Sequence, residues 1–408
     1  EIVAMANVAT QAASDPGILA FATQADLARG RPADACRRSQ SASNEPYILR
    51  LRAYCFALNG EQAPTDLAIE VARQAGVNDF WLFSALPVLY GATAKPAARF
   101  DTSLNAAVSI AAELKPGKLP LASSTLLALD VIAREEDSPA LLRAQAAQNA
   151  LRGYAIAPEI AKASLAPAVA MKSTKAAPLP ALVLGLQSIA AAQTPAAKAL
   201  TIETTLKKTS TYADYVAAAR LLRDDIVNLP RDATTAPAAL SMARASLAMG
   251  DVKLAAAWRE IIGQSGPAPS ESVRAALDTA IAIAGGGNDA AALQHRIELG
   301  GAGAARDAAL FGALGQPTSE RASALIAATP QAKGFKIADA TLVAAMVSAS
   351  QRGAQGETAL YAARVIGPCA HVIDRASLVS TIQALRAVGL ESAAREIALE
   401  AMIGAGIG

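Results

Sequence analysis

The clearest local pattern in the chain runs from Pro237 to Ile262 and reads PAALSMARASLAMGDVKLAAAWREII. Its first half repeats alanine and leucine at helical spacing, so these residues share one face. Gly250 and Asp251 then interrupt the run, because glycine reaches the left-handed conformation that ends a helix and aspartate caps the next one. The second half again carries its apolar residues on one side and includes Trp258. The pattern predicts two helices joined by a short turn.

A low aromatic content extends this helical interpretation to the whole chain. Apolar residues make up 53% of the 408 residues but aromatic residues only 4%, so alanine and the aliphatic residues carry most of the apolar surface. Alanine is the strongest helix former, whereas strands favour β-branched and aromatic residues. Alternating strand-like runs bounded by turn signals are hard to find. We therefore predict an all-α fold.

Two other stretches echo the same pattern. One lies near the C-terminus and reads STIQALRAVGLESAAREIALEAMI, with Gly389 between its halves. The other is looser, has a longer turn and reads YILRLRAYCFALNGEQAPTDLAIEVARQ. Small residues where two helices would touch, closed by one large aromatic residue, resemble a degenerate tetratricopeptide (TPR-like) repeat. The resemblance implies an α-solenoid of antiparallel helix hairpins, each burying its apolar stripe against its neighbours. It includes no catalytic motif.

The helices are expected to fall into two segments. The range 158–180 interrupts the periodic pattern for longer than any other stretch, with several prolines among lysines and hydroxyl residues. We predict an N-terminal helical module with an aromatic-rich core over 1–157, a Pro-rich connection over 158–180 and a C-terminal helical-repeat module over 181–408.

Two of the three cysteines lie close together in the sequence. We expect Cys36 and Cys55 on consecutive antiparallel helices, which lets the hairpin bring them face to face. A disulfide closing so short a loop stabilises by about 3 kcal/mol on the chain-entropy estimate and requires an oxidising compartment. The alternative is two buried thiols. If this disulfide forms, we expect a bacterial protein of the periplasm or outside. The sequence begins at Glu1 without a leader, and we expect that a signal peptide has been removed.

The most aromatic segment is a predicted helix from Phe80 to Tyr90, which includes Trp81 and Phe83. Aromatic residues are enriched at interaction hot spots, so this helix is a candidate groove or patch for a partner. The alternative is a denser core in the N-terminal module.

Arginines cluster near the two cysteines, and the candidate binding residues among them are Arg37, Arg38, Arg50 and Arg52. On antiparallel helices some of them would form one basic surface, able to meet an acidic partner, a lipid head group or a cell-wall polymer. Acidic residues lie among them, so local ion pairing is the alternative.

Several classes of function are disfavoured. A net charge of +2 provides no field that would recruit nucleic acid. The continuous apolar run from Leu179 to Ala192 is shorter than the ~20 residues of a spanning helix. No nucleophile elbow, dinucleotide turn or zinc-protease motif occurs. The pair Cys369 and His371 lacks the repeated short spacings of zinc ligands. We expect no cofactor, no metal and no transmembrane span.

Three functions remain. We favour a non-enzymatic helical-repeat scaffold that binds other proteins within a bacterial envelope assembly, by analogy of fold type a motility or secretion accessory. A homo-oligomer is a further expectation. The alternatives are an all-helical enzyme with a pocket of scattered charged residues, and a carrier whose lipid or peptide groove is lined by the Phe80–Tyr90 helix.

Overall fold

The structure is a computed structural model that describes residues 16–40, 44–114, 124–136, 138–153, 156–173, 179–286, 290–330, 334–367 and 369–404. Within these ranges the chain forms 23 α-helices and no strand, which confirms the all-α prediction. An isolated parallel bridge joins Lys336 to Ile373. The first fifteen residues of the predicted N-terminal module lie outside the described residues. None of the helices in the described ranges has both the length and the apolar content to cross a membrane.

The chain divides into two compact units, Glu1–Val183 (unit 1) and Leu184–Gly408 (unit 2). The helices of unit 1 are α2 (Pro16–Ala28), α3 (Pro32–Ser39), α4 (Pro46–Leu58), α5 (Gln62–Gln74), α6 (Phe80–Ala85), the 3-10 helix η2 (Leu86–Tyr90), α7 (Ser103–Ala111), α8 (Leu126–Arg134), α9 (Ala140–Arg152) and α10 (Pro158–Val169). Helix α11 (Ala181–Ala191) crosses the division between the units.

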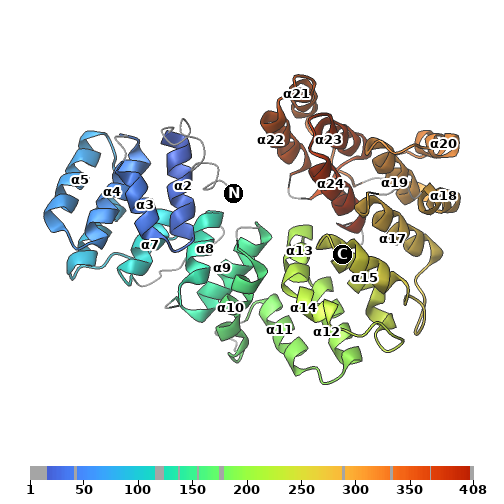
Figure 1. The fold of residues 1–408 in the computed structure, drawn as a ribbon, viewed down its shortest axis with the longest axis horizontal. Coiled ribbons are helices and arrows are strands. Elements are labelled where there is room, and N and C mark those ends of the chain that lie inside the picture. Colours follow the sequence, from blue (N-terminus) through green and yellow to red (C-terminus); the bar gives the residue numbers. More distant parts are fainter. Residues whose placement is uncertain are drawn as a thin grey trace. The chain divides into compact units, whose positions relative to one another are not determined.

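Unit 2 carries the remaining helices (Figure 1). They are α12 (Pro195–Lys207), α13 (Tyr212–Leu221), α14 (Arg223–Val227), η4 (Ala236–Ala238), α15 (Ala239–Ala248), α16 (Val252–Arg259), α17 (Glu271–Ala284), α18 (Ala290–Leu299), α19 (Gly301–Ala313), α20 (Glu320–Ala328), α21 (Ala340–Gln351), α22 (Gln355–Ile366), η5 (Ala370–Val372), α23 (Arg375–Ala387) and α24 (Glu391–Ile403).

The unit boundary differs from the predicted one. Residues Pro158–Val169, assigned from the sequence to a Pro-rich connection, form α10, which packs against α8 and α9. Pro158 stands at the start of this helix, where a missing N–H costs nothing. Pro167 lies inside the helix, near its end. Unit 1 therefore continues through most of the predicted connection.

A recurrent turn joins helix pairs in both units. Gly60, Gly250 and Gly389 each end a helix with a positive φ of 75°, 77° and 79°. After Gly250, the N–H of Asp251 donates to the carbonyl of Ser246 at 2.8 Å, the long bond of a Schellman motif. The Asp251 carboxylate then accepts from the Leu254 N–H at 3.0 Å and caps α16. The helix–glycine–helix prediction for this stretch is confirmed, although α16 ends at Arg259.

Small side chains fill most of the core. Alanines with essentially no exposed surface recur in nearly every long helix of the described residues, and the largest fully buried side chains are Trp258 and Phe311. Small residues allow helices to pack closely, so many short helices bury their faces with little aromatic bulk. The N-terminal unit nevertheless buries aromatic rings, including Tyr47, Tyr54 and Phe83.

The two units differ in how their helices connect. In unit 1 most packing joins helices that are close in sequence, such as α4 with α5 and α8 with α9. In unit 2 helix α24 packs against α17 and α15 as well as α23, and α23 packs against α19 (Figure 1). A strict solenoid restricts each hairpin to its neighbours. Unit 2 departs from that pattern, because its last helix, α24, packs against α15 and α17, which lie far before it in the sequence.

Candidate functional site

The predicted cysteine pair comes from α3 and α4, which pack against each other. The sulfurs of Cys36 and Cys55 lie 2.00 Å apart and their Cα atoms 5.5 Å apart, with 19 residues of sequence separation. The chain therefore has a cysteine pair at disulfide distance. The hydroxyl of Ser39, at the end of α3, donates to the sulfur of Cys55 at 3.8 Å. Cys369 has no cysteine partner among the described residues.

Two of the predicted arginines make ion pairs next to the cysteine pair. Arg37 is highly exposed and pairs with Asp34 one turn earlier on α3. Nε of Arg38 lies 2.7 Å from the buried carboxylate of Asp26 on α2. Local ion pairing, the alternative considered from the sequence, accounts for both side chains.

The other two predicted arginines hold neighbouring elements together. Nη1 of Arg50 lies 3.3 Å from Asp79, the N-cap residue of α6. Nε of Arg52 donates to the carbonyl of Ser39 at the end of α3, at 3.2 Å. The four arginines therefore each make a separate contact with the fold.

The predicted helix from Phe80 to Tyr90 is shorter than expected. Helix α6 ends at Ala85, and η2 continues to Tyr90. Pro87 falls at the start of η2. Proline lacks an N–H and clashes with the preceding turn, so it breaks the α-helical ladder at this point.

The four aromatic side chains of this segment point to different surroundings. Phe83 is buried in the core of unit 1, whereas Phe80 is 82% exposed. The indole N–H of Trp81 donates to the carbonyl of Ala97 at 2.7 Å. The Tyr90 hydroxyl donates to Asp66 of α5 at 3.3 Å. One of the four rings therefore lies in the core, one is exposed, and two bond to neighbouring segments.

An apolar groove lies nearby, between α4 and α5. It has a volume of about 460 Å³ and is lined by Leu49, Arg52, Phe56, Ala63, Pro64, Leu67, Ala68 and Val71. Leu67 is 67% exposed and Val71 is 41% exposed. We call this surface the α4–α5 groove.

Sequence reasoning missed this groove although α5 carried a signal. Buried Ala68, Ile69 and Ala72 form the inner face of α5. Leu67 and Val71 are four residues apart, so they share a second face of α5. On a surface helix this outer face normally carries polar residues. A second apolar stripe on a short amphipathic helix marks a surface that needs a neighbour.

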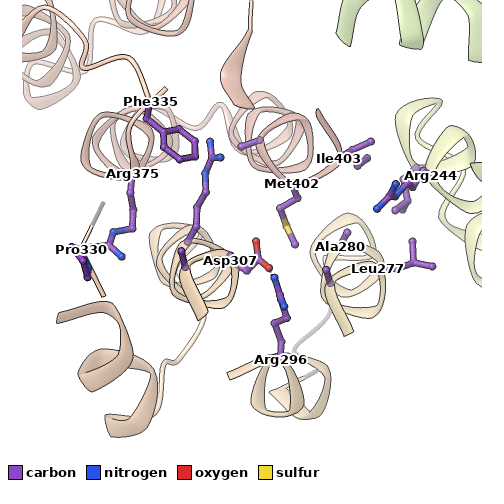
Figure 2. Close-up of a pocket in the computed structure, with 16 residues that line it drawn as sticks. Arg244, Leu277, Ala280, Arg296, Asp307, Pro330, Phe335, Arg375, Met402 and Ile403 are labelled. Carbon is purple, nitrogen blue, oxygen red and sulfur yellow. The ribbon is translucent and has the colours of Figure 1, made fainter. Parts of the chain in front are cut away.

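A second concave site lies in unit 2 and is cationic. It has a volume of about 300 Å³, and its charged lining residues are Arg244, Arg296, Arg306, Arg375 and Asp307. Apolar side chains from α15, α17 and α24 complete the wall. Figure 2 shows side chains from several helices turned toward this space, with the Arg296 guanidinium directed at the Asp307 carboxylate. We call it the arginine cavity.

A buried ion pair forms one side of the arginine cavity. Nε of Arg296 on α18 lies 2.8 Å from the carboxylate of Asp307 on α19, and both side chains are less than a tenth exposed. Nη1 of Arg296 also donates to the hydroxyl of Ser272 at 2.7 Å. Burial raises the pKa of Asp307, and the charges of Arg296 and Arg306 oppose that rise. The pair ties α17, α18 and α19 together.

Arg306 stabilises the turn before α23. Its Nη1 donates to the carbonyl of His371 at 2.9 Å, and its Nη2 donates to those of Ala370 and Ile373 at 3.2 and 3.3 Å. The guanidinium carbon also lies 4.7 Å from the ring centroid of Phe335. Burial lowers the pKa of the Arg306 guanidinium. Its Nε is buried and makes no hydrogen bond within the described part of the chain.

The two remaining arginines of the cavity differ from each other. Arg375 caps the end of α20, because its Nη2 donates to the carbonyls of Ile326 and Thr329 at 3.1 Å each. Arg244 on α15 makes neither a hydrogen bond nor an ion pair with any residue that the structure describes. Figure 2 places Arg244 beside Leu277, at the opposite side of the cavity from Arg375.

The described residues offer no group of three or more metal-ligating side chains. Burial and the Glu400 carboxylate raise the pKa of the Cys369 thiol. Burial and the charge of Arg306 lower the pKa of His371. The thiol is therefore kept protonated and the imidazole neutral at pH 7, which is the opposite of an activated cysteine–histidine pair.

No protein-family model, curated protein or solved structure matches this chain.

Proposed function

We propose that this chain is a non-enzymatic helical-repeat scaffold, which binds an amphipathic helix of another protein in the α4–α5 groove. The observation that carries the proposal is the exposure of Leu67 and Val71 beside a groove of about 460 Å³. Contiguous exposed apolar surface of this kind marks interaction sites. Recognition of a helix in an apolar groove is a recurrent mode of peptide binding.

The packing of the helices supports a helical occupant. Helix α5 packs against α4 and η2, and its outer face lies at the edge of unit 1 (Figure 1). In an array of helix hairpins, each apolar stripe is buried by the next helix. A helix supplied by a partner protein would continue this stacking and cover Leu67 and Val71.

The lining of the groove also suggests the partner's chemistry. Arg52 is the one charged side chain among the described residues that line it. A partner helix with leucine-type residues at positions i, i+3, i+4 and i+7 would fill the groove. An acidic residue at its edge would face Arg52 and fix its direction.

We place the scaffold in an oxidising compartment, the bacterial periplasm or outside. The cysteine pair at disulfide distance supports this placement, since disulfides persist in such compartments. Envelope assemblies of motility and secretion are the first partners to test, by analogy of fold type. Thiol titration of protein that is purified without reductant and then unfolded should find one reactive thiol, that of Cys369. The other two cysteines should be protected. Three reactive thiols would contradict the placement.

Site-directed photocrosslinking tests the proposed interaction. A crosslinking amino acid at Leu67 should trap one discrete protein in cells. The same group at Leu360 of α22 is the matched control, because Leu360 is 70% exposed against 67% for Leu67. Binding of the trapped protein, once purified, should weaken roughly thirtyfold in Leu67→Glu, the effect of losing a hot spot of about 2 kcal/mol. Leu360→Glu should bind as the wild type does.

Light scattering distinguishes a partner protein from a second copy of this chain. A concentration-dependent dimer that Leu67→Glu abolishes would assign the groove to self-association and overturn the proposal. Equal crosslinking from Leu67 and Leu360 would likewise show that exposure alone, and not the groove, produces the contact.

A further inference from the structure

We infer that the arginine cavity binds a small amphipathic anion, with a carboxylate or phosphate head group on a short apolar body. The site lies within unit 2 and shares no residue with the α4–α5 groove. The inference therefore goes beyond the proposed scaffold function and stands independently of it.

The charge of the lining is the first argument. Four arginines line the cavity against the single carboxylate of Asp307. Arg296 and Arg306 are 7% and 8% exposed, so their charges are held largely away from water. Buried charges are costly unless they are paired, and Arg296 has a direct ion pair with Asp307. Arg306 has no direct ion pair within the described ranges, and the carboxylates of Asp307 and Asp374 favour its charge only from a distance. A bound anion would compensate the charge of Arg306 directly.

The second argument is that one buried donor of the cavity lacks a hydrogen-bond partner in the part of the chain that the structure describes. The buried Nε of Arg306 has no hydrogen-bond partner among the described residues, although its two Nη atoms hold the turn before α23. Half-buried Arg244 makes no hydrogen bond or ion pair with the described residues, and its charge acts on the buried hydroxyl of Tyr215. A purely structural role explains the Nη contacts of Arg306, but not its Nε.

Gly303 leaves the space against α19 that the Arg296 guanidinium occupies at the cavity. A Cβ at this position would lie 2.6 Å from Nη2 of Arg296. Nε and Nη1 of Arg296 bind Asp307 and Ser272, so Nη2 is the guanidinium nitrogen that faces the helix surface left open by the glycine. A guanidinium presents donors in a planar fork that matches a carboxylate or phosphate.

The apolar wall defines the rest of the ligand. Leu277 and Ala280 of α17 and Met402 and Ile403 of α24 line the cavity (Figure 2). A volume of about 300 Å³ stands at the small end of ligand sites. The cavity therefore suits a short acyl or aryl group and excludes a long lipid chain.

Isothermal titration of the full-length protein tests the inference with four probes: octanoate, octyl phosphate, octanol and inorganic phosphate. Octanoate or octyl phosphate should bind at least about tenfold more tightly than octanol, because a charged hydrogen bond contributes about 1.5–3 kcal/mol. Inorganic phosphate should bind more weakly than octyl phosphate, because it leaves the apolar wall uncovered. The tighter of the two amphipathic anions identifies the head group.

Substitutions locate the binding site. Arg244→Gln should weaken binding of the preferred anion about tenfold or more, since Arg244 has no hydrogen bond or ion pair with the described residues whose loss would unfold the unit. Arg274→Gln is the matched control, because Arg274 is an exposed arginine of α17 outside the cavity lining. Gly303→Ala retains every charge and should weaken binding by moving the Arg296 guanidinium. Circular dichroism verifies that each variant remains folded.

Three results would overturn the inference. Octanol binding as tightly as octanoate and octyl phosphate would make the site an apolar cavity without anion recognition. Equal affinities in wild-type, Arg244→Gln and Arg274→Gln proteins would place any binding elsewhere. Absence of heat and of a thermal shift with both amphipathic anions at millimolar concentration would show that the arginines serve the fold alone.

Discussion

The concave sites of unit 1 and unit 2 differ in how many arginines of the described ranges line them: Arg52 alone in the α4–α5 groove and four in the arginine cavity. In unit 1 the exposed Arg37 pairs with Asp34 at the surface, and the concave site of that unit, the α4–α5 groove, is almost wholly apolar. In unit 2 Arg306 and Arg375 turn inward to bind carbonyl groups at the ends of other elements, and the concave site is cationic. Similar alanine-rich helix pairs therefore produce two chemically different surfaces. The position of the arginines decides whether a concave site is apolar or cationic.

The largest expected effect tests the buried charges of unit 2. Asp307→Ala should reduce the free energy of unfolding of unit 2 by about 3–5 kcal/mol, because it leaves Arg296 buried without its partner. Asp34→Ala in unit 1 should cost less than about 0.5 kcal/mol, because its ion pair with Arg37 is exposed. Equal costs would remove the contrast between the units.

Tryptophan fluorescence measures these effects separately. The chain has two tryptophans, Trp81 in unit 1 and Trp258 in unit 2. Urea unfolding in a Trp81→Phe background follows unit 2, and unfolding in a Trp258→Phe background follows unit 1. Each unit should give its own transition.

The second effect concerns the cysteine pair. Replacing Cys36 and Cys55 by serine should reduce the stability of unit 1 by about 3 kcal/mol, because the unfolded chain regains the entropy of a short closed loop. Unit 2 should not change, since its free Cys369 belongs to no such loop. If reductant lowers the stability of wild-type unit 1 by the same amount, the effect belongs to the disulfide bond and not to the serine side chains. A loss spread over both transitions would contradict it.

A third and smaller effect concerns the turn that both units share. Gly60→Ala in unit 1 and Gly250→Ala in unit 2 should each cost about 1 kcal/mol, since both glycines have positive φ and open space around the position of a Cβ. Gly356→Ala is the control, because Gly356 also faces open space but has an ordinary helical φ. It should be neutral or stabilising. Denaturant midpoints of the two units will measure all three.

The smallest effect separates binding from stability. Leu67→Glu should change the stability of unit 1 by less than about 0.5 kcal/mol, because the side chain is 67% exposed. The same substitution should weaken partner binding in the α4–α5 groove roughly thirtyfold. A large loss of stability would show that Leu67 belongs to the core, and the groove would lose its functional interpretation.

Local features of the fold were predictable from the sequence, whereas the sites were not. The turn at Gly250 and Asp251 follows from two adjacent residues whose conformational preferences decide a helix end. The cysteine pair follows from a short hairpin. In contrast, Arg306 binds carbonyls more than sixty residues away, at η5, and no periodicity within α19 indicates this contact. The arginine cavity therefore depends on long-range packing that a single sequence does not reveal.

The aromatic segment shows a different limit. The sequence shows that residues 80–90 are rich in aromatic residues, but it does not indicate which of their rings are buried. Phe83 entered the core while its neighbour three positions earlier, Phe80, remained exposed. The proline at the start of η2 accounts for the change of helix type, but both rings precede it, so it does not decide which of them is buried.

The return of α24 to α15 and α17 has a consequence for protein synthesis. A ribosome adds about 5–20 residues per second, and α24 is translated long after α15 and α17. The part of α15 and α17 that α24 covers stays exposed until α24 emerges, whereas the helices of unit 1 meet their main neighbours soon after translation. Nascent unit 2 is consequently the part of the chain on which holding chaperones would act.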